Sequence, residues 1–342
     1  MSFFTFGSKD IGMDLGTSNI LLTIKGKGIV LNEPSVVAIN RQTNQIVATG
    51  HEAKEMLGRT PEQINAVKPM KDGVIADLTA TSLLVKNIMA KVCKRYNCGR
   101  PRVVVGVPSG ITEVEERAVQ EAVASAGARE VYLIEEPMAA AIGAGLDVAE
   151  PTGNMVIDIG GGTTEIAVIS LGGIVVSDSI KVAGDELDQE VIAYVKNNLN
   201  LAIGATIAEQ VKIELGCATK PVEDRTMEIS GRDLTTGLPD NRIISSKEVC
   251  EAMAPSMEKI VDLVKSTLEK TPPELVSDIV ERGITITGGG ALIKNLDMLI
   301  SQRIEVPVYV AERPLECVVN GTSKTIQDID KLRTVLINAK KR

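Results

Sequence analysis

Two segments of the chain resemble each other, and together they constrain the fold more than any other feature. Residues 11–19 read IGMDLGTSN and residues 156–164 read VIDIGGGTT. Each is an apolar strand carrying an aspartate, followed by a turn of small residues and a second apolar strand, at 20–24 or 166–169. In a hairpin, such a turn directs successive backbone N–H groups outward, and glycine lets the backbone approach an anion closely. The sequence therefore predicts two phosphate-binding hairpins, one opening each half of the chain.

A single turn of this kind is a weak indication, because turns rich in glycine and aspartate are common. Two copies favour function more strongly, since they could hold one phosphate chain from opposite sides. Asp14 and Asp158 stand where a hydrated divalent cation would bridge to phosphate oxygens. The turn residues expected to contact phosphate are Gly16, Thr17, Ser18, Asn19, Gly160, Gly161, Gly162, Thr163 and Thr164.

A third glycine-rich turn consists of Gly288, Gly289 and Gly290, with Ala291 directly after it. It follows an apolar strand at 283–287 and is expected to open a helix near residue 292. A helix N-terminus with bare glycines suits the close approach of a nucleotide, although an ordinary strand–helix turn would look the same. The chain has no Gly-x-x-x-x-Gly-Lys-Ser/Thr pattern, which excludes the Walker type of phosphate loop.

Composition excludes several other classes of function. The 37 Lys and Arg residues are outnumbered by 45 Asp and Glu residues, a net charge of -8 that argues against direct nucleic-acid binding. With four Tyr, three Phe and no Trp, the chain also lacks the aromatic residues of a base-stacking surface, and its core must be aliphatic. The length of 342 residues is enough for two domains.

Metal and thiol chemistry are also disfavoured. The only histidine is His51. A zinc site is therefore improbable, and a His-activated nucleophile would have to rely on this single residue. We expect reduced structural thiols in a cytoplasmic protein, because residues 1–10 do not form a signal peptide and no apolar run reaches the roughly 18–20 residues of a spanning helix. The five cysteines, which show no paired spacing, are Cys93, Cys98, Cys217, Cys250 and Cys317.

Along the chain, short β-rich runs alternate with amphipathic helical stretches, which predicts an α/β fold. A strand at 102–107 is followed by a helix that begins with a capping box of Thr112 and Glu115. That helix is expected to carry apolar residues at four-residue spacing, at Val114, Ala118, Ala122 and Ala126. A second helix is expected over 187–199, and the polar, turn-rich residues 220–243 read as part of an inserted subdomain.

These motifs, in this order, resemble the MreB/Mbl family of bacterial actins, within the superfamily of actin, heat-shock chaperone and sugar-kinase ATPases. The resemblance runs nearly from end to end. Its most specific stretches are KGKGIVLNEPSVVA (25–38), KPMKDGVIAD (68–77), GVPSGIT (106–112), IEEPMAAAIGAGL (134–146), GNMVIDIGGGTTEIAVIS (153–170), TPPELVSDIVERGI (271–284) and TGGGALI (287–293).

The resemblance implies an actin-like fold of the duplicated ribonuclease H type, with two domains around a nucleotide cleft and a smaller subdomain in each. The first large subdomain would comprise residues 1–35, 80–150 and 320–342, with 36–79 as its small subdomain. The second large subdomain would comprise 151–181 and 245–319, with 182–244 as its small subdomain.

The resemblance also implies roles for individual residues in binding ATP or ADP with Mg²⁺. Asp14 and Asp158 would hold the cation through water, and Glu136 would orient the attacking water with help from Thr163. The alternative for Glu136 is a helix N-terminal carboxylate that interacts with the helix dipole. The residues matching the adenosine side are Glu209, Lys212, Gly288, Gly289, Gly290 and Ala291.

By resemblance, the chain would polymerise head to tail, hydrolyse ATP, lie on the inner face of the cell membrane and maintain cell shape with other shape-determining or membrane proteins. Three alternatives share the ATPase core. A plasmid-segregating actin would need no membrane affinity. A small-molecule kinase would need an aspartate base for which no motif is found. A chaperone would need a peptide-binding domain after the ATPase core, and the chain ends about where that core ends.

Membrane contact has three candidate sources. The loop that family members use lies at 96–99, where Cys98 and Gly99 replace the usual bulky apolar pair. The N-terminal cluster Phe3, Phe4 and Phe6 either inserts shallowly into lipid or forms a strand leading into the sheet. The basic tail 331–342 is expected to form a helix that aligns Leu332, Val335, Leu336 and Ala339 and ends in Lys340, Lys341 and Arg342. That helix would either contact anionic lipid or dock on the first domain with a solvated basic tip.

Overall fold

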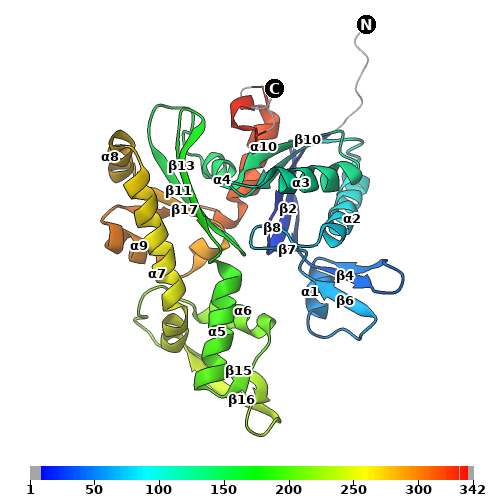
Figure 1. Ribbon diagram of the computed structural model, residues 1–342, viewed down its shortest axis with the longest axis vertical. Helices are drawn as coiled ribbons and strands as arrows, with labels where there is room; N and C mark the ends of the chain where they lie inside the picture. Colours follow the sequence, from blue (N-terminus) through cyan, green and yellow to red (C-terminus); the bar gives the residue numbers. More distant parts are fainter. Residues whose placement is uncertain (1–8, 331, 338–342) are drawn as a thin grey trace.

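The fold consists of two lobes, each built on a five-stranded sheet (Figure 1). It was obtained as a computed structural model that describes residues 9–330 and 332–337. The first sheet has the order β10 (Glu130–Glu135), β9 (Arg102–Val107), β1 (Ile11–Leu15), β2 (Asn19–Ile24) and β3 (Gly28–Pro34). The second has the order β13 (Gly173–Ile180), β12 (Thr164–Ser170), β11 (Asn154–Ile159), β17 (Ile284–Thr287) and β18 (Val308–Val310).

The two sheets have the same topology. In the first, β1 pairs antiparallel with β2 and parallel with β9. In the second, β11 pairs antiparallel with β12 and parallel with β17. The strand carrying each aspartate is thus central in its sheet, and each predicted phosphate turn joins that strand to its antiparallel neighbour. The duplication predicted from the sequence is confirmed at the level of the fold.

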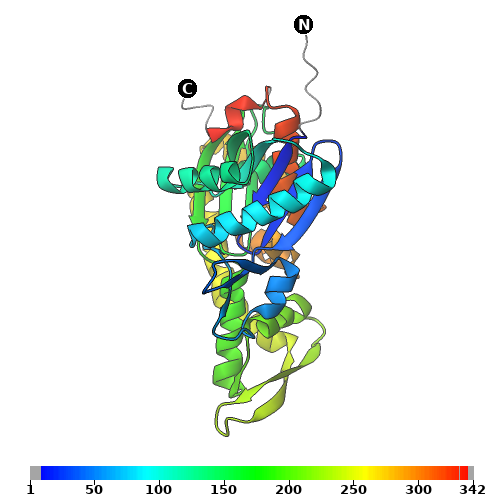
Figure 2. The ribbon, with the colours of Figure 1, turned by 90° about the vertical axis from the view of Figure 1, so that its right-hand side faces the viewer.

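Helices cover the sheets, and smaller units project beside the gap between the lobes (Figures 1 and 2). The helices are α2 (Leu78–Tyr96), α3 (Glu113–Ser125), α4 (Glu136–Ala144), α5 (Gly184–Asn198), α7 (Ser246–Lys270), α8 (Pro273–Arg282), α9 (Leu296–Ile304) and α10 (Cys317–Gln327). In the first lobe the smaller unit holds β4 (Val37–Asn40), β5 (Ile46–Thr49), β6 (Ile64–Val67) and α1 (His51–Met56), with the hairpin β7 (Met70–Lys71) and β8 (Val74–Ile75) after it. In the second it holds α6 (Ala205–Leu215), β14 (Leu201–Ala202), β15 (Thr226–Asp233) and β16 (Pro239–Ser245). The subdomain boundaries given above stay a prediction.

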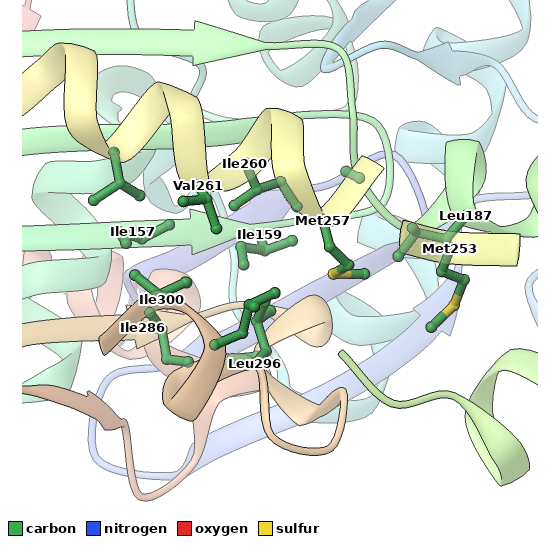
Figure 3. Packing of buried hydrophobic residues seen from close by; sticks show 14 of the residues in the cluster. Ile157, Ile159, Leu187, Met253, Met257, Ile260, Val261, Ile286, Leu296 and Ile300 are labelled. Carbon is green, nitrogen blue, oxygen red and sulfur yellow. The ribbon is translucent and has the colours of Figure 1, made fainter. Parts of the chain in front are cut away.

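The core is aliphatic, as the composition predicts. In the second lobe, Ile157 and Ile159 of β11 pack with Val261 of α7 and with Ile286 and Ile300 (Figure 3). No aromatic side chain belongs to the buried core within the described residues. Burial of branched aliphatic side chains, at about 1.5–3 kcal/mol each, therefore supplies the packing energy of both lobes.

Helices α4 and α10 cross between the lobes and hold them together. Helix α4 follows β10 of the first sheet but packs against β11 and β12 of the second. Helix α10 follows the short 3-10 turn Pro314–Glu316 in the second lobe but packs against β1 and β9 of the first. The two helices therefore form the central contact between the lobes.

The predicted buried face of α3 is wrong. Helix α3 begins with the predicted capping box, but Val114 is 78% exposed and the buried residues are Val119, Ala122 and Val123. Val119 and Val123 together remove more apolar area from water than Val114 with the alanines of the predicted face would, so their side of the helix is the buried one.

Residues 332–336 of the C-terminal segment do not form the predicted helix, although Ile337 is helical. Arg333–Val335 is a short 3-10 turn, and Leu336 is extended and forms a β-bridge with Ile134 of β10. Val335 and Leu336 are buried, so the apolar residues of this segment dock on the first lobe. The edge of β10 offers backbone hydrogen bonds that override helix propensity here. Phe3, Phe4, Phe6, Ala339, Lys340, Lys341 and Arg342 lie outside the described residues.

Candidate functional site

The two predicted phosphate hairpins meet at one end of a cavity of about 470 Å³ between the lobes. A methyl group on Gly161 would overlap the side chain of Ser18, so the two turns are in direct contact through a position that only glycine can fill. The predicted site residues that line the cavity are Asp14, Gly16, Thr17, Ser18, Asn19, Glu136, Asp158, Gly160, Gly161, Gly162, Thr163, Glu209, Lys212, Gly288, Gly289 and Gly290.

Local hydrogen bonds give each hairpin turn its shape. In the first, Ser35 Oγ donates to the carbonyl oxygen of Gly16 at 2.6 Å, and the amide of Ser35 donates to that of Ser18 at 2.9 Å. In the second, the amide of Gly160 donates to the carbonyl oxygen of Thr163 at 2.9 Å. With their carbonyls occupied in this way, the turns are held in shape at the surface of the cavity.

Two predicted site residues do not line the cavity. Thr164 is fully buried, and its hydroxyl donates to the carbonyl oxygen of Val182 at 2.6 Å. Ala291 is 3% exposed and packs in the core of the second lobe. The helix expected near residue 292 begins at Leu296, because a 3-10 turn, Gly289–Leu292, precedes it. The glycines at 288–290 still face the cavity, and Gly288 has a φ of +79°, a conformation that favours glycine.

Glu209 and Lys212 also line the cavity, and both are already engaged with protein groups. Lys212 Nζ lies 2.8 Å from Asp188 Oδ1 and also donates to the carbonyl oxygen of Gly184 at 2.8 Å. Glu209 Oε2 lies 2.7 Å from Lys54 Nζ, which belongs to the other lobe. Both side chains keep a surface on the cavity and are held in place by these contacts.

Apolar residues that the sequence analysis missed also line the cavity. Ile213, Leu292 and Leu315 line the cavity and are 70%, 57% and 46% exposed. An aromatic base would find apolar surface here beside backbone glycines. Ile213 could have been found from the sequence, because it is a large apolar residue outside the buried face of α6. That face consists of Ala208, Val211 and Leu215.

A second missed feature is Glu165, the fourth member of an acidic cluster in which Asp158 and Glu165 are buried and Asp14 and Glu136 are half-buried at the cavity. Burial raises the pKa of Asp14 to about 7, that of Asp158 to about 6 and that of Glu165 to about 8. Burial and the charges of Glu165, Asp14 and Asp158 hold the pKa of Glu136 well above its usual range. Glu165 could have been noticed in the sequence, because it is an acidic residue within the otherwise apolar run EIAVIS of strand β12.

Comparison with known proteins identifies the family. The profile of the MreB/Mbl protein family matches residues 8–334. The chain belongs to the MreB/Mbl family. The Bacillus subtilis (strain 168) cell shape-determining protein Mbl is 49% identical over 325 residues, which cover 95% of this chain and 98% of that protein. The Escherichia coli (strain K12) cell shape-determining protein MreB is 51% identical over 328 residues, 94% of each chain.

Solved structures confirm the actin-like fold of this MreB/Mbl-family chain. Crystal structures of MreB5 of Spiroplasma citri bound to ADP and to AMPPNP have a TM-score of 0.90 and 43% identity, and cover 94% of this chain and 97% of theirs. A MamK double helical filament has a TM-score of 0.78 at 19% identity, a similarity of fold alone.

The acidic cluster is suited to a cation that is held partly by a ligand. The charged neighbours that raise the pKa values of Asp14, Glu136 and Glu165 are all carboxylates, so added positive charge would relieve their repulsion. Within the part of the chain that is described, no group of three or more His, Cys, Asp or Glu side chains could hold a metal ion by itself. Asp14 and Asp158 fit the carboxylate share of a Mg²⁺ site completed by water and phosphate oxygens.

The raised pKa values predict that the nucleotide-free protein loses stability as the pH rises. The folded-state pKa of Asp14, about 7, lies above its ordinary value of 3.8, so the folded protein keeps a proton that the unfolded chain releases. Stability is therefore greatest below pH 3.8 for this group and is lost between pH 3.8 and about 7. Relative to wild type, Asp14→Asn should gain roughly 2 kcal/mol or more at pH 7 and little at pH 4. Urea unfolding in EDTA at both pH values measures this, and an equal difference at both would contradict it.

Proposed function

We propose that this chain is a nucleotide-binding bacterial actin that hydrolyses ATP, assembles into filaments and determines or maintains cell shape. The observation that carries the proposal is the contact of the two glycine-rich hairpins, Gly161 against Ser18, beneath a cavity large enough for a nucleotide. Backbone N–H groups at such turns bind phosphate, and the exposed apolar residues of the lining suit a base. MreB5 of Spiroplasma citri has been solved bound to ADP and to AMPPNP, which supports nucleotide binding by this chain as well.

For hydrolysis, the chain supplies positioning and a proton acceptor. Glu136 lies at the start of α4 and on the cavity, next to both phosphate hairpins, where its carboxylate would orient a water molecule and accept its proton. Thr163 would add a hydroxyl contact to that water. Bound Mg²⁺ would neutralise charge on the phosphate oxygens, and it would also lower the pKa values of the surrounding carboxylates. The raised pKa of Glu136 in the free protein fits a base that becomes competent once the cation and nucleotide are in place.

We further propose self-assembly into filaments and attachment to an anionic membrane surface, both on the basis of the family. None of the helices among the described residues is long and apolar enough to cross a membrane. The loop at 96–99 offers little for insertion, since Cys98 is fully buried. Attachment would therefore fall to the segments outside the described residues: the N-terminal phenylalanines and the basic end at 340–342.

Electron microscopy tests the assembly and its membrane dependence together. With ATP, the protein is expected to form filaments, and more of them on a monolayer containing anionic lipid than on a neutral one. Deleting residues 340–342 should lower co-sedimentation with anionic vesicles by about fivefold or more, because each Lys or Arg near such a surface contributes about 1 kcal/mol.

Two outcomes would contradict these proposals separately. Absence of filaments under every nucleotide and lipid condition would remove the cytoskeletal function. Equal co-sedimentation of the full-length and shortened chains with anionic and neutral vesicles would remove the basic end from membrane attachment. Replacing Phe3, Phe4 and Phe6 with serine in a parallel variant tests the other terminus.

A further inference from the structure

Two ion pairs join the lobes at residues on or next to the cavity lining, since Glu209 lines the cavity and Asp185 follows Gly184, which also lines it. Lys68 Nζ lies 2.8 Å from Asp185 Oδ1, and the side chains are 39% and 35% exposed. Lys54 Nζ lies 2.7 Å from Glu209 Oε2. Each pair joins a basic residue of the first lobe to an acidic residue of the second. The lobes are therefore joined here through side chains, at a distance from the α4–α10 crossing.

Asp185 is also attached to the second phosphate hairpin. It lies in the first turn of α5, and its amide donates to the carbonyl oxygen of Gly161 at 2.7 Å. The preceding amide, of Gly184, donates to the carbonyl oxygen of Gly160 at 3.2 Å. A displacement of Asp185 would therefore also move the turn that is expected to contact phosphate.

Lys68 stands beside the β7–β8 hairpin, whose turn touches both phosphate hairpins. The amide of Gly73 donates to Thr17 Oγ1 at 3.2 Å in the first hairpin. A methyl group on Gly162, in the second hairpin, would lie 2.9 Å from the amide nitrogen of Asp72. A third cross-lobe contact is close by, since Lys181 Nζ lies 3.7 Å from Asp72 Oδ2. The Asp72–Gly73 turn therefore contacts both hairpins.

We propose that Lys68 and Asp185 are positioning residues, which hold the β7–β8 turn and both phosphate hairpins in register at the γ-phosphate end of the cavity. Their ion pair fixes the Asp72–Gly73 turn from one side and the carbonyls of Gly160 and Gly161 from the other. The inference rests on the proposed ATPase function and adds residues that contact no nucleotide themselves. Because the pair joins the two lobes beside the second phosphate hairpin, it is expected to slow nucleotide release and to keep Glu136 aligned with the phosphates.

The test uses charge reversal and charge exchange in the full-length protein. Lys68→Glu and Asp185→Lys each place like charges together, whereas the double variant restores an opposite pair in reversed order. Each single variant is expected to release a fluorescent ATP analogue about 3- to 10-fold faster than wild type. Each should also lower kcat more than it changes KM. The double variant should recover most of the wild-type release rate and most of the wild-type kcat. Hydrogen exchange at the amides of residues 68–75 and 183–187 should accelerate in the single variants and return in the double one.

The matched control is the ion pair between Arg303 and Glu258, which is similarly exposed and lies between α9 and α7, away from the cavity. Arg303→Glu should leave release, turnover and exchange in both segments unchanged. The proposal is overturned if the single variants behave like wild type or if the double variant is no better than they are. If wild-type protein binds no nucleotide, the proposed function fails, and the exchange data still decide whether the ion pair holds the two segments. The milder Lys68→Met repeats the comparison should a reversed charge prevent folding.

Discussion

Replacing Glu136 with glutamine or alanine is expected to lower ATP turnover about 100-fold or more and to leave nucleotide affinity within about threefold of wild type. The loss follows from removing the group placed to accept the water proton, since general-base catalysis contributes about 10²–10⁴-fold in rate. Affinity should persist because the backbone N–H groups of the phosphate hairpins and the apolar residues of the cavity lining are untouched. Phosphate release in steady state measures turnover, and equilibrium titration with a fluorescent nucleotide measures affinity.

The adjacent carboxylate provides a matched control. Glu135 precedes α4 and does not line the cavity, so Glu135→Gln removes the same charge one residue away and should keep turnover within about threefold. If glutamine at 136 leaves turnover unchanged, Glu136 is no part of the mechanism, and the helix-dipole interpretation of this residue stands instead. If Glu136→Gln also abolishes nucleotide binding, its effect is on the shape of the cavity.

The parts of the site that the sequence predicted are those encoded locally. Each phosphate turn is a short run in which glycine, threonine and aspartate have fixed spacing, so strand, turn and strand can be read without knowing what they pack against. The two predicted residues that do not line the cavity, Thr164 and Ala291, fall at the ends of such runs, where the side chain turns from the cavity into the core. Composition does not distinguish the two directions at those positions.

The parts that could not be predicted depend on contacts between distant residues. The ion pair of Lys68 with Asp185 joins positions 117 residues apart, and both are ordinary charged residues in their own segments. Leu336 is similar, because its extended conformation depends on the free edge of β10 and not on its neighbours in the tail. Glu165 is intermediate: an acid within an apolar strand is visible in the sequence, but its position beside Glu136 requires the second sheet.

Replacing Gly321 with alanine is expected to lower the free energy of unfolding by about 2–3 kcal/mol. Gly321 lies in α10, and an added methyl group would overlap the carbonyl oxygen of Ala139 in α4. The contact is reciprocal, since a methyl group on Gly143 of α4 would overlap the carbonyl oxygen of Cys317 in α10. These overlaps involve backbone on both sides, so relief requires the two helices to move apart.

The sign of this effect separates two physical contributions. Helix propensity alone would make an alanine in a helix interior more stable than glycine by about 1 kcal/mol, so a loss of stability can come only from the crossing. Gly204→Ala serves as control, because nothing lies within 4 Å of the added methyl group and its effect should stay below about 1 kcal/mol. Guanidinium unfolding compares the two, and a Gly321→Ala protein as stable as wild type would contradict the close crossing. Since α4 begins at Glu136, helices pushed apart here should also lower ATP turnover at temperatures where the variant remains folded.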